Sequence, residues 1–419
     1  MHLPDPSRGL AVERRRLDRA AIRQSHERLA NGLASIGERD QVPHLRLVQD
    51  QDVHRLHYRP RVDARMTRVR LAAAFALASS LASCGVGAPS ESEAVKVAFI
   101  ADLSGPDALE HVLPARQGAE LVLRIAQITG ASDVPVELVE LDFAAGPAIL
   151  QEIEDDPAFV AAIVAPAVDA GASIARSDVP AVSLSGLGAT PPQNAAWLRF
   201  VAGLDVVADT LAGQVEGSAT CILSEAPVPD DLGDLLADRL GGVLSTIEPA
   251  SAGSVVERSG CTTVSWVGSP DGGAEAAQAL EGSEIAFAGG DRLLGPDFIA
   301  NARSAAEGAT SICSCADVST SLDLDVQRFI QDYQALFGSA PGAYAVEGWD
   351  AGNLILEALR EGEPTRDSVR RFLGAVSSVE GLAGIYRFTP DGELVDPANH
   401  VVTYLALGGR WTSAAQPAG

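Results

Sequence analysis

Short apolar, β-branched runs alternate with longer stretches of helical periodicity from about residue 94 onward. The first part of this pattern predicts strands over 95–100, 136–141, 161–164 and 181–183, and helices over 114–128, 148–154 and 170–176. Strands separated by helices form mainly parallel sheets with helices on both faces. The pattern therefore predicts a doubly wound α/β unit.

The pattern restarts near residue 205. It predicts strands over 220–224, 243–247, 261–267, 284–288 and 311–315, and helices over 232–240, 274–280, 298–306, 325–336 and 346–359. A terminal hairpin is predicted from strands Gly384–Phe388 and Val401–Leu407 around a turn at 389–392. Two successive α/β patterns of similar size predict two doubly wound lobes in one chain.

Charge divides the 419 residues, of which 47% are hydrophobic, into unlike parts. Residues 1–65 hold 13 arginines and 9 acidic side chains, and residues 66–83 add two arginines and no acid. The net charge is -25 for the whole chain and therefore -31 from residue 84 onward. Nucleic-acid binding needs clustered positive charge, so no nucleic-acid partner is expected. Residues 1–65 lack sustained apolar periodicity and are interpreted as a non-native or disordered extension.

A secretion signal is predicted over residues 66–83. Met66 opens a short basic segment, and an eleven-residue apolar stretch over 71–81 leads through small residues to Cys84. This order is typical of a signal peptide, and the stretch is too short for an ordinary transmembrane helix. An apolar core helix that ends at Cys84 is the alternative. We expect Met66 to be the true start and residues 84–94 to form a tether.

Cysteine usage agrees with export. Leu-Ala-Ser-Cys, ending at Cys84, resembles the lipobox of bacterial lipoproteins, which implies a lipid anchor on the Cys84 thiol outside the cytoplasm. The other four cysteines allow three disulfide connectivities in an oxidising compartment. Cys221 and Cys261 each open a predicted strand and are the first choice of pair. A direct bond between Cys313 and Cys315 is expected to be strained, and no CxxC or HxxxH spacing supports a metal site.

Several phrases, in order over residues 95–411, resemble one family. They are VAFIADLSGP, AAIVAPAVDAGASIARSDVPAVSLSG, RFVAGLDVVADTLAGQV, FAGGDRLLGPDFIANARSAAEGA, FIQDYQALFGSAPGAYAVEGWDAGNLILEAL and GIYRFTPDGEL. Their order and spacing resemble the type I periplasmic solute-binding proteins of the branched-chain amino-acid-binding family. The resemblance implies two lobes joined by a three-strand hinge, with a ligand cleft between them. Lobe I would comprise 95–204 and 317–378, and lobe II 205–316 and 379–415.

Motifs of common enzymes are missing from the sequence. It contains no G-x-S-x-G, H-E-x-x-H, Walker A or G-x-G-x-x-G pattern, and only His111 and His400 follow the predicted signal. We therefore expect no catalysis, no cofactor and no metal. Asp323-x-Asp325 lacks the glycine and the distal glutamate of an EF-hand loop and is interpreted as a solvated helix start.

Loops that follow the predicted strands are the candidate ligand site, because ligands of doubly wound sheets bind beyond the carboxyl ends of the strands. In the first lobe these candidates are Leu103, Ser104, Gly105, Ser185 and Gly186. Ordinary strand-to-helix caps are the alternative for the serines. In the second lobe Trp266, Gly268 and Asp291 end predicted strands, and Tyr344 precedes a long helix. Trp266 could stack on a ligand or belong to the core.

Two departures from the family pattern affect the expected ligand. Asp169 stands where the resemblance implies a serine that holds the α-carboxylate of an amino acid, and Glu110-His111 replaces an aromatic residue. Leu232-Gly233 replaces a Tyr-Gly pair. Asp169 and Glu110 favour a cationic or amide-bearing solute. A one-residue misalignment that leaves Asp169 as a helix N-cap is the alternative.

We therefore expect an extracytoplasmic lipoprotein that binds a small amino-acid-like, amide or cationic solute by lobe closure. The resemblance implies that it is a monomer that delivers the solute to an ABC permease and ATPase complex. A ligand-sensing or interaction lipoprotein on the same fold, not coupled to transport, is the alternative function.

Overall fold

The computed structural model describes residues 94–105, 108–146, 148–174, 177, 179–188, 196–225 and 232–414. The predictions for residues 1–65, for the signal over 66–83, for Cys84 and for nearly all of the tether lie outside these residues. Among the helices of the described ranges, none is both long and apolar enough to span a bilayer. All described residues belong to one unit of the chain.

Lobe I is built on a parallel five-stranded sheet in the order β2-β1-β3-β4-β5. Its strands are β1 (Val95–Ala101), β2 (Val136–Asp142), β3 (Phe159–Val164), β4 (Ala181–Ser183) and β5 (Trp197–Arg199). The first four confirm the prediction. The three residues of β5 are too few to show periodicity, and the strand is defined by its pairing with β4.

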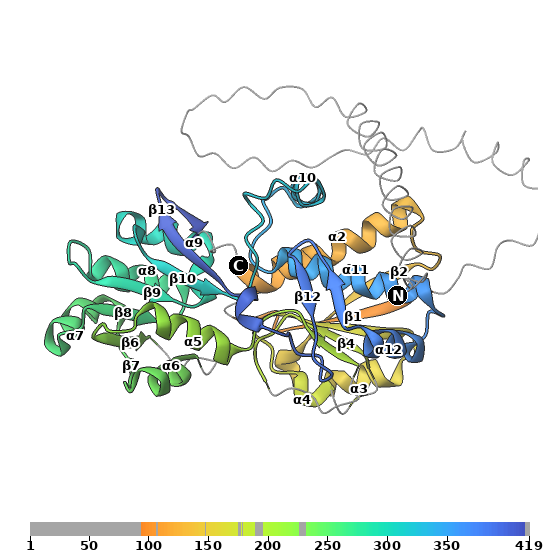
Figure 1. Ribbon diagram of the computed structural model, residues 1–419, viewed down its shortest axis with the longest axis horizontal. Coiled ribbons are helices and arrows are strands. Elements are labelled where there is room, and N and C mark those ends of the chain that lie inside the picture. Colours follow the sequence, from red (N-terminus) through yellow and green to blue (C-terminus); the bar gives the residue numbers. More distant parts are fainter. Residues whose placement is uncertain are drawn as a thin grey trace, which may run out of the picture. The chain divides into compact units, whose positions relative to one another are not determined.

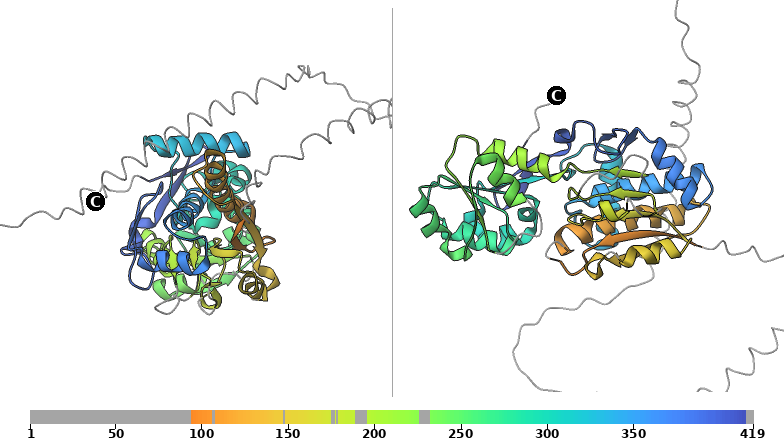
Figure 2. Two further views of the ribbon diagram at one scale, coloured as in Figure 1. Left: turned by 90° about the vertical axis from the view of Figure 1, so that its right-hand side faces the viewer. Right: turned by 90° about the horizontal axis from the view of Figure 1, so that it is seen from below.

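Helices cover both faces of this sheet. They are η1 (Ala108–Val112, a π-helical turn), α2 (Leu113–Thr129), η2 (Phe143–Ala145), α3 (Ala148–Asp155), α4 (Gly171–Ile174), α10 (Leu324–Phe337), α11 (Ala345–Glu361) and α12 (Arg366–Ala375). α2 and α11 lie on one side and α3 and α4 on the other (Figure 1), as right-handed crossovers in this strand order require. α10 lies on the outside of α2, where Phe329 and Tyr333 pack on Leu121 (Figure 2).

Glycines allow α2 and α11 to approach closely. A Cβ on Gly118 of α2 would collide with the Ala345 carbonyl, and one on Gly348 of α11 would collide with the Ala115 carbonyl. The backbones of the two helices are therefore in direct contact at Gly118 and Gly348, where there is no room for a side chain. This contact brings the start of α11 next to the start of α2, at the edge of the lobe where the chain faces lobe II.

Lobe II has a seven-stranded mixed sheet in the order β14-β13-β10-β9-β8-β6-β7. Its strands are β6 (Thr220–Ser224), β7 (Leu244–Thr246), β8 (Thr263–Trp266), β9 (Ala286–Gly289), β10 (Thr310–Cys313), β13 (Val402–Leu407) and β14 (Arg410–Ser413). The five predicted strands of this lobe are confirmed: β6 has the predicted bounds, and the other four are shorter than predicted. β13 and β14 are antiparallel and extend the parallel part of the sheet past β10.

Two helical layers cover the lobe II sheet. The helices are α5 (Leu204–Gln214), α6 (Leu232–Leu240), η3 (Pro249–Ser251), α7 (Ala252–Ser259), α8 (Pro270–Ala279), η4 (Asp291–Leu294), α9 (Pro296–Ala302), η5 (Arg303–Ala306) and η6 (Pro397–His400). One core cluster packs α7, α8 and α9 on the sheet, and another packs α5 and α6 (Figure 1). Neither α7 nor α12 was predicted. The two doubly wound lobes confirm the predicted fold class.

The predicted strand pairing of the terminal hairpin is wrong, whereas its turn at 389–392 is confirmed by the Gly392 amide, which donates to the Thr389 carbonyl at 2.9 Å. Residues 384–388 do not pair with 401–407; β12 (Ile385–Arg387) pairs instead with β11 (Ser378–Glu380), and β13 pairs with β10 and β14. Tyr386, Phe388 and Leu394 are buried in the lobe I core. The segment from 379 to about 394 therefore belongs to lobe I, which differs from the expected boundary. The chain passes between the lobes after β5, after β10 and before β13.

Both pairs of cysteines form disulfides. Cys221 and Cys261 are bonded with a Cα–Cα distance of 5.8 Å, which joins β6 to the turn before β8. Cys313 and Cys315 are also bonded to each other, with a Cα–Cα distance of 5.1 Å. The first-choice pair is confirmed, and the second bond also forms; β10 ends at Cys313, so Cys315 is not held in the extended strand.

Candidate functional site

A cavity of about 40 Å³ lies between the two lobes. Its wall combines loops after β3 and β4, the first two crossing segments, and the starts of η4 and α11. The lining residues are His111, Ala167, Leu184, Gly186, Leu187, Val201, Ala202, Leu204, Val207, Asp291, Arg292, Ser314 and Tyr344. The space holds only a few water molecules. An amino-acid-sized solute could enter only after the lobes move apart.

Asp291 of lobe II contacts two residues of lobe I at this cavity. It opens η4 of lobe II, and its Oδ2 accepts a hydrogen bond from the Tyr344 hydroxyl of lobe I. Its backbone oxygen lies 3.2 Å from Nε2 of His111, which is buried and meets the Tyr344 ring edge-on at 5.5 Å. Glu110 crosses the same boundary, because a Cβ on Gly295 would collide with its carboxylate. The lobes are therefore in direct polar contact.

Two residues of the cavity wall have a backbone conformation that side chains disfavour. Ala167 has a φ of 59° and Tyr344 a φ of 64°, and among the described residues only Arg303 and Asp396 are other non-glycine examples. Left-handed conformations at such residues cost on the order of 1 kcal/mol and tend to cluster at ligand sites. Both residues belong to the lobe I side of the cavity wall, and this clustering supports a binding role for the cleft.

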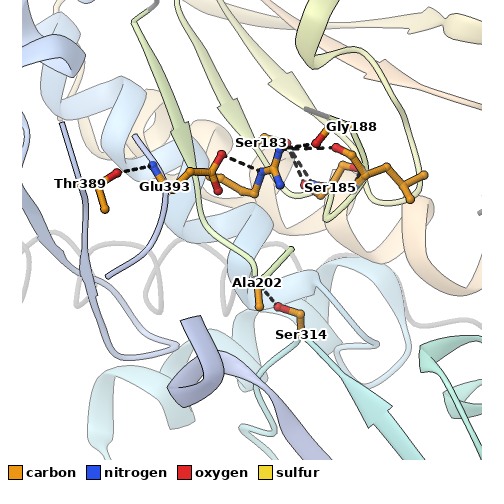
Figure 3. A network of polar contacts seen from close by, with 9 residues as sticks. Ser183, Ser185, Gly188, Ala202, Ser314, Thr389 and Glu393 are labelled. Atoms are coloured by element: carbon orange, nitrogen blue, oxygen red, sulfur yellow. Dashed lines mark hydrogen bonds and ion pairs between the residues drawn. The ribbon is translucent and has the colours of Figure 1, made fainter. Parts of the chain in front are cut away.

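A buried arginine holds the loop after β4 at the cavity. Arg199 is 4% exposed, and its guanidinium donates to the Gly188 carbonyl at 3.1 Å and lies 3.5 Å from the Glu393 carboxylate. Figure 3 shows Glu393, Gly188 and the serines Ser183 and Ser185 in one polar network. The β11–β12 region, to which Glu393 is adjacent, therefore positions a wall of the cavity.

Only some of the predicted ligand residues come together. Gly186, Asp291 and Tyr344 line the cavity. Ser185 lies beneath the same loop with 1% exposure, and its Oγ accepts from the Leu187 amide at 3.1 Å. That hydrogen bond is the strand-to-loop cap that we considered as the alternative.

The other predicted residues do not reach the cavity. Trp266 is 1% exposed in the lobe II core and donates its indole N–H to the Ser269 carbonyl at 2.9 Å, so the predicted stacking role is wrong. Gly268 faces Glu225 and the edge of Trp266.

In lobe I the expected first loop is also outside. Leu103 and Ser104 are exposed, and the Ser104 amide and hydroxyl turn back to Asp102. Gly105 likewise packs on Asp102, and Asp169 is exposed beside Gly188. The expected electrostatic role of Asp169 in the ligand site therefore has no support in its position.

His111, Arg292 and Ser314 line the cavity and were not predicted as site residues. Ser314 lies on the second crossing between Cys313 and Cys315, and its Oγ accepts a hydrogen bond from the Ala202 amide of the first crossing (Figure 3). A serine enclosed by two cysteines is a visible sequence signal. Its meaning depends on knowing that this segment passes between the lobes.

Two buried carboxyl groups lie near the crossing on α11. Asp350 accepts from the Leu382 amide at 2.7 Å, the Ala383 amide at 3.0 Å and the Tyr386 hydroxyl at 2.9 Å. Burial raises the pKa of Asp350 to about 6, against the effect of these donors. The Glu347 carboxyl accepts from the Ala316 amide at 2.7 Å through Oε1, its Oε2 has no hydrogen-bond partner among the described residues, and burial raises its pKa to about 8. Burial therefore disfavours the charged form of both groups, and more strongly for Glu347, which has fewer compensating donors.

Metal binding has no support in the part of the chain that the structure covers. There, no group of three or more His, Cys, Asp and Glu side chains is arranged to hold an ion.

Comparisons with known proteins agree with the architecture. A family model described as periplasmic binding protein matches residues 243–402. No functionally curated protein matches the sequence. Solved structures do match, each at an identity that shows the fold alone.

A leucine-bound ABC transporter substrate-binding protein from Desulfitobacterium hafniense is 18% identical, with a TM-score of 0.59, over 77% of this chain and 100% of its own. The leucine-binding protein LivK from Thermotoga maritima is also 18% identical, with a TM-score of 0.61, over 77% of this chain and 98% of its own. The isoleucine-bound branched-chain amino acid transporter protein LivJ from Streptococcus pneumoniae is 15% identical, with a TM-score of 0.62, over 77% and 100%. The resemblance found in the sequence is thus confirmed: the described residues have the fold of the type I periplasmic binding proteins.

Proposed function

We propose that this chain is a solute-binding protein that captures a small amino-acid-like solute between its lobes. The observation that carries the proposal is the cavity, which both lobes line and across which Tyr344 donates to Asp291. Hinged closure of two lobes on a ligand is a common binding mechanism. The similar fold of leucine- and isoleucine-bound transporter proteins supports it further.

Asp291 supplies the chemistry of the proposed site. A solute ammonium that replaces the Tyr344 hydroxyl would form a charge-assisted hydrogen bond with the Asp291 carboxylate, and such bonds are stronger than neutral ones. We therefore propose that Asp291, and not Asp169 or Glu110, binds the cationic group of the solute. The apolar wall from Leu184, Leu187 and Val201 would receive the uncharged part of the solute.

Opening must precede binding, because the cavity holds only a few waters while the lobes touch. In the proposed cycle the contacts of His111 and Tyr344 with Asp291 break, the solute enters, and the lobes close around it. An ABC permease and ATPase complex would receive the loaded protein. The signal over 66–83 would direct export and be removed, and a lipid on Cys84 would then hold the monomeric protein at the outer face of the cell membrane.

Calorimetry and native mass spectrometry on the purified chain test this proposal. The probes are L-leucine, L-isoleucine, L-glutamine and L-arginine. We expect at least one amine to bind and Asp291→Asn to weaken it about tenfold or more, since a charged hydrogen bond is lost. Asp169→Asn is the matched control, because Asp169 is an exposed acid outside the cavity.

Unchanged binding in Asp291→Asn would contradict the assigned role of that carboxylate. Failure of every probe to bind, together with no co-purified small molecule in the native mass spectrum, would contradict solute capture.

A further inference from the structure

Ser314 has a position that no other residue of the cavity wall shares. It lies on the second crossing, its Oγ is bonded to the Ala202 amide of the first crossing, and it lines the cavity. The side chain is therefore fixed between two of the three segments that join the lobes. A group at this point stays in the cleft when the lobes rotate about these segments.

The hydroxyl of Ser314 has unused hydrogen-bonding capacity. A serine hydroxyl offers one donor and two acceptor lone pairs. The Ala202 amide uses one lone pair, and among the described residues no acceptor takes the hydroxyl proton. Ser314 is 5% exposed and is one of the residues that line the cavity. A solute acceptor there would satisfy the donor.

The disulfide between the neighbours of Ser314 holds this donor in place. Cys313 and Cys315 are 0% and 1% exposed, and their bond closes a ring around the serine backbone. The Tyr404 hydroxyl donates to the Cys315 carbonyl at 3.2 Å and so ties the ring to lobe II. Few rotations remain that could withdraw Ser314 from the cleft.

We propose that Ser314 is a specificity-determining residue that donates its hydroxyl proton to a carboxylate or amide carbonyl of the solute, and that the Cys313–Cys315 disulfide positions it. This inference rests on the proposed solute-binding function. Asp291 holds the amine, and Ser314 holds the acceptor end. The pair thus selects solutes that carry both groups, such as amino acids and their amides.

Simple amines would be rejected by the same arrangement. An amine without a carboxylate leaves the Ser314 donor without a partner in a desolvated cleft, and an unsatisfied buried polar group is costly. The predicted discrimination between amino acids and simple amines depends on the one hydrogen bond that the Ser314 hydroxyl donates. A variant without the hydroxyl should therefore lose the preference while it retains the affinity for the amine.

Matched probe pairs test this role: L-leucine with isoamylamine, and L-arginine with agmatine. The second member of each pair lacks only the carboxylate. We expect Ser314→Ala to weaken the amino acid of the binding pair about tenfold and its amine less than about twofold. Ser314→Thr, which keeps the hydroxyl, should retain the preference for the amino acid. Far-UV circular dichroism and the melting temperature check that each variant folds.

The positioning role is tested with two pairs of substitutions. Cys313→Ala/Cys315→Ala should lower the ratio of the affinity for the amino acid to that for its matched amine, as Ser314→Ala does. Cys221→Ala/Cys261→Ala removes the disulfide that lies away from the crossing and should leave the preference unchanged. If the first double variant does not fold, reduction of Cys221→Ala/Cys261→Ala, in which Cys313–Cys315 is the remaining disulfide of the described residues, should weaken the preference instead.

Three results would contradict parts of this scheme. Equal weakening of both members of a pair, or no weakening of either, in Ser314→Ala overturns the inference while solute binding stands. A preference unaltered in a folded Cys313→Ala/Cys315→Ala overturns the positioning role. No binding of any of the four probes to the unaltered chain overturns the inference together with the proposed binding of amino-acid-like solutes.

Discussion

The two lobes secure their peripheral segments in different ways. In lobe I, a buried carboxylate on α11 ties down the β11–β12 segment: Asp350 accepts hydrogen bonds from the Leu382 and Ala383 amides and the Tyr386 hydroxyl. In lobe II, the Cys221–Cys261 disulfide closes a segment of 40 residues that contains α6, β7 and α7. One lobe uses directional polar bonds in its interior, and the other uses a covalent link.

Burial explains why each solution suits its lobe. Asp350 and Tyr386 are 3% and 1% exposed, and Tyr386 stacks on Phe200 at 4.3 Å, so hydrogen bonds there are shielded from water. The edge strand β7 in lobe II is half-buried to exposed over all three residues. Hydrogen bonds at such an edge compete with water and contribute little. A disulfide stabilises independently of burial, because it restricts the unfolded chain.

The largest effect is expected from Asp350→Ala. The substitution leaves two backbone amides and the Tyr386 hydroxyl without their acceptor, which should lower the free energy of unfolding by about 4 kcal/mol. Urea unfolding measures the loss, and hydrogen exchange should show reduced protection at Leu382 and Ala383. Asp350→Asn keeps one acceptor and should lose about half as much.

Glu363→Ala is the control for that measurement, because Glu363 is an exposed acid next to the same lobe's α12. A loss in Asp350→Ala no larger than in this control would show that the carboxylate does not hold the segment, and the contrast between the lobes would disappear.

The lobe II disulfide should matter somewhat less. Removal of a bond that closes about 40 residues costs about 3 kcal/mol in chain entropy, and Cys221→Ala/Cys261→Ala should show this loss in urea unfolding. Hydrogen exchange should increase in α6, β7 and α7 and stay unchanged in lobe I. Equal loss of hydrogen-exchange protection in both lobes would mean that they unfold as one unit, and the disulfide would then not act on lobe II alone.

Strands of the sheet centres were predictable because their signal is local. β1 and β3 are buried along nearly their whole length, so unbroken apolar runs reveal them. The partner of β12 is β11, which lies only a short turn before it in the chain but has no fully buried residue. The apolar pattern therefore identified β12 and gave no signal for β11.

The candidate site divides in the same manner. Gly186 and Asp291 were found because they follow strands whose carboxyl ends face the cleft. Trp266 also ends a strand, yet its side chain points into the core, and the sequence carries no signal for that direction. Ser314 was missed because its role arises from two crossings that meet only in the folded chain.

The smallest expected effect concerns Glu347, which lies one helical turn before Asp350 and accepts a hydrogen bond from the Ala316 amide. Its pKa is raised by burial to about 8 in the folded protein, against an ordinary value near 4.5. Below pH 4.5 the carboxyl is protonated in both states. As the pH rises toward 8, the unfolded chain releases this proton while the folded chain keeps it, so the stability contributed by the raised pKa is lost.

Glu347→Gln should remove this dependence while it retains an acceptor for the Ala316 amide. Between pH 5 and pH 7 the unaltered chain should lose about 2 kcal/mol more in unfolding free energy than the variant, as urea titrations at each pH would measure. Parallel pH profiles in the two proteins would show that Glu347 is ionised in the folded state. Lobe I would then contain two buried charged carboxylates at neutral pH. The larger number of hydrogen-bond donors around Asp350 would then not explain which of the two carboxyl groups ionises.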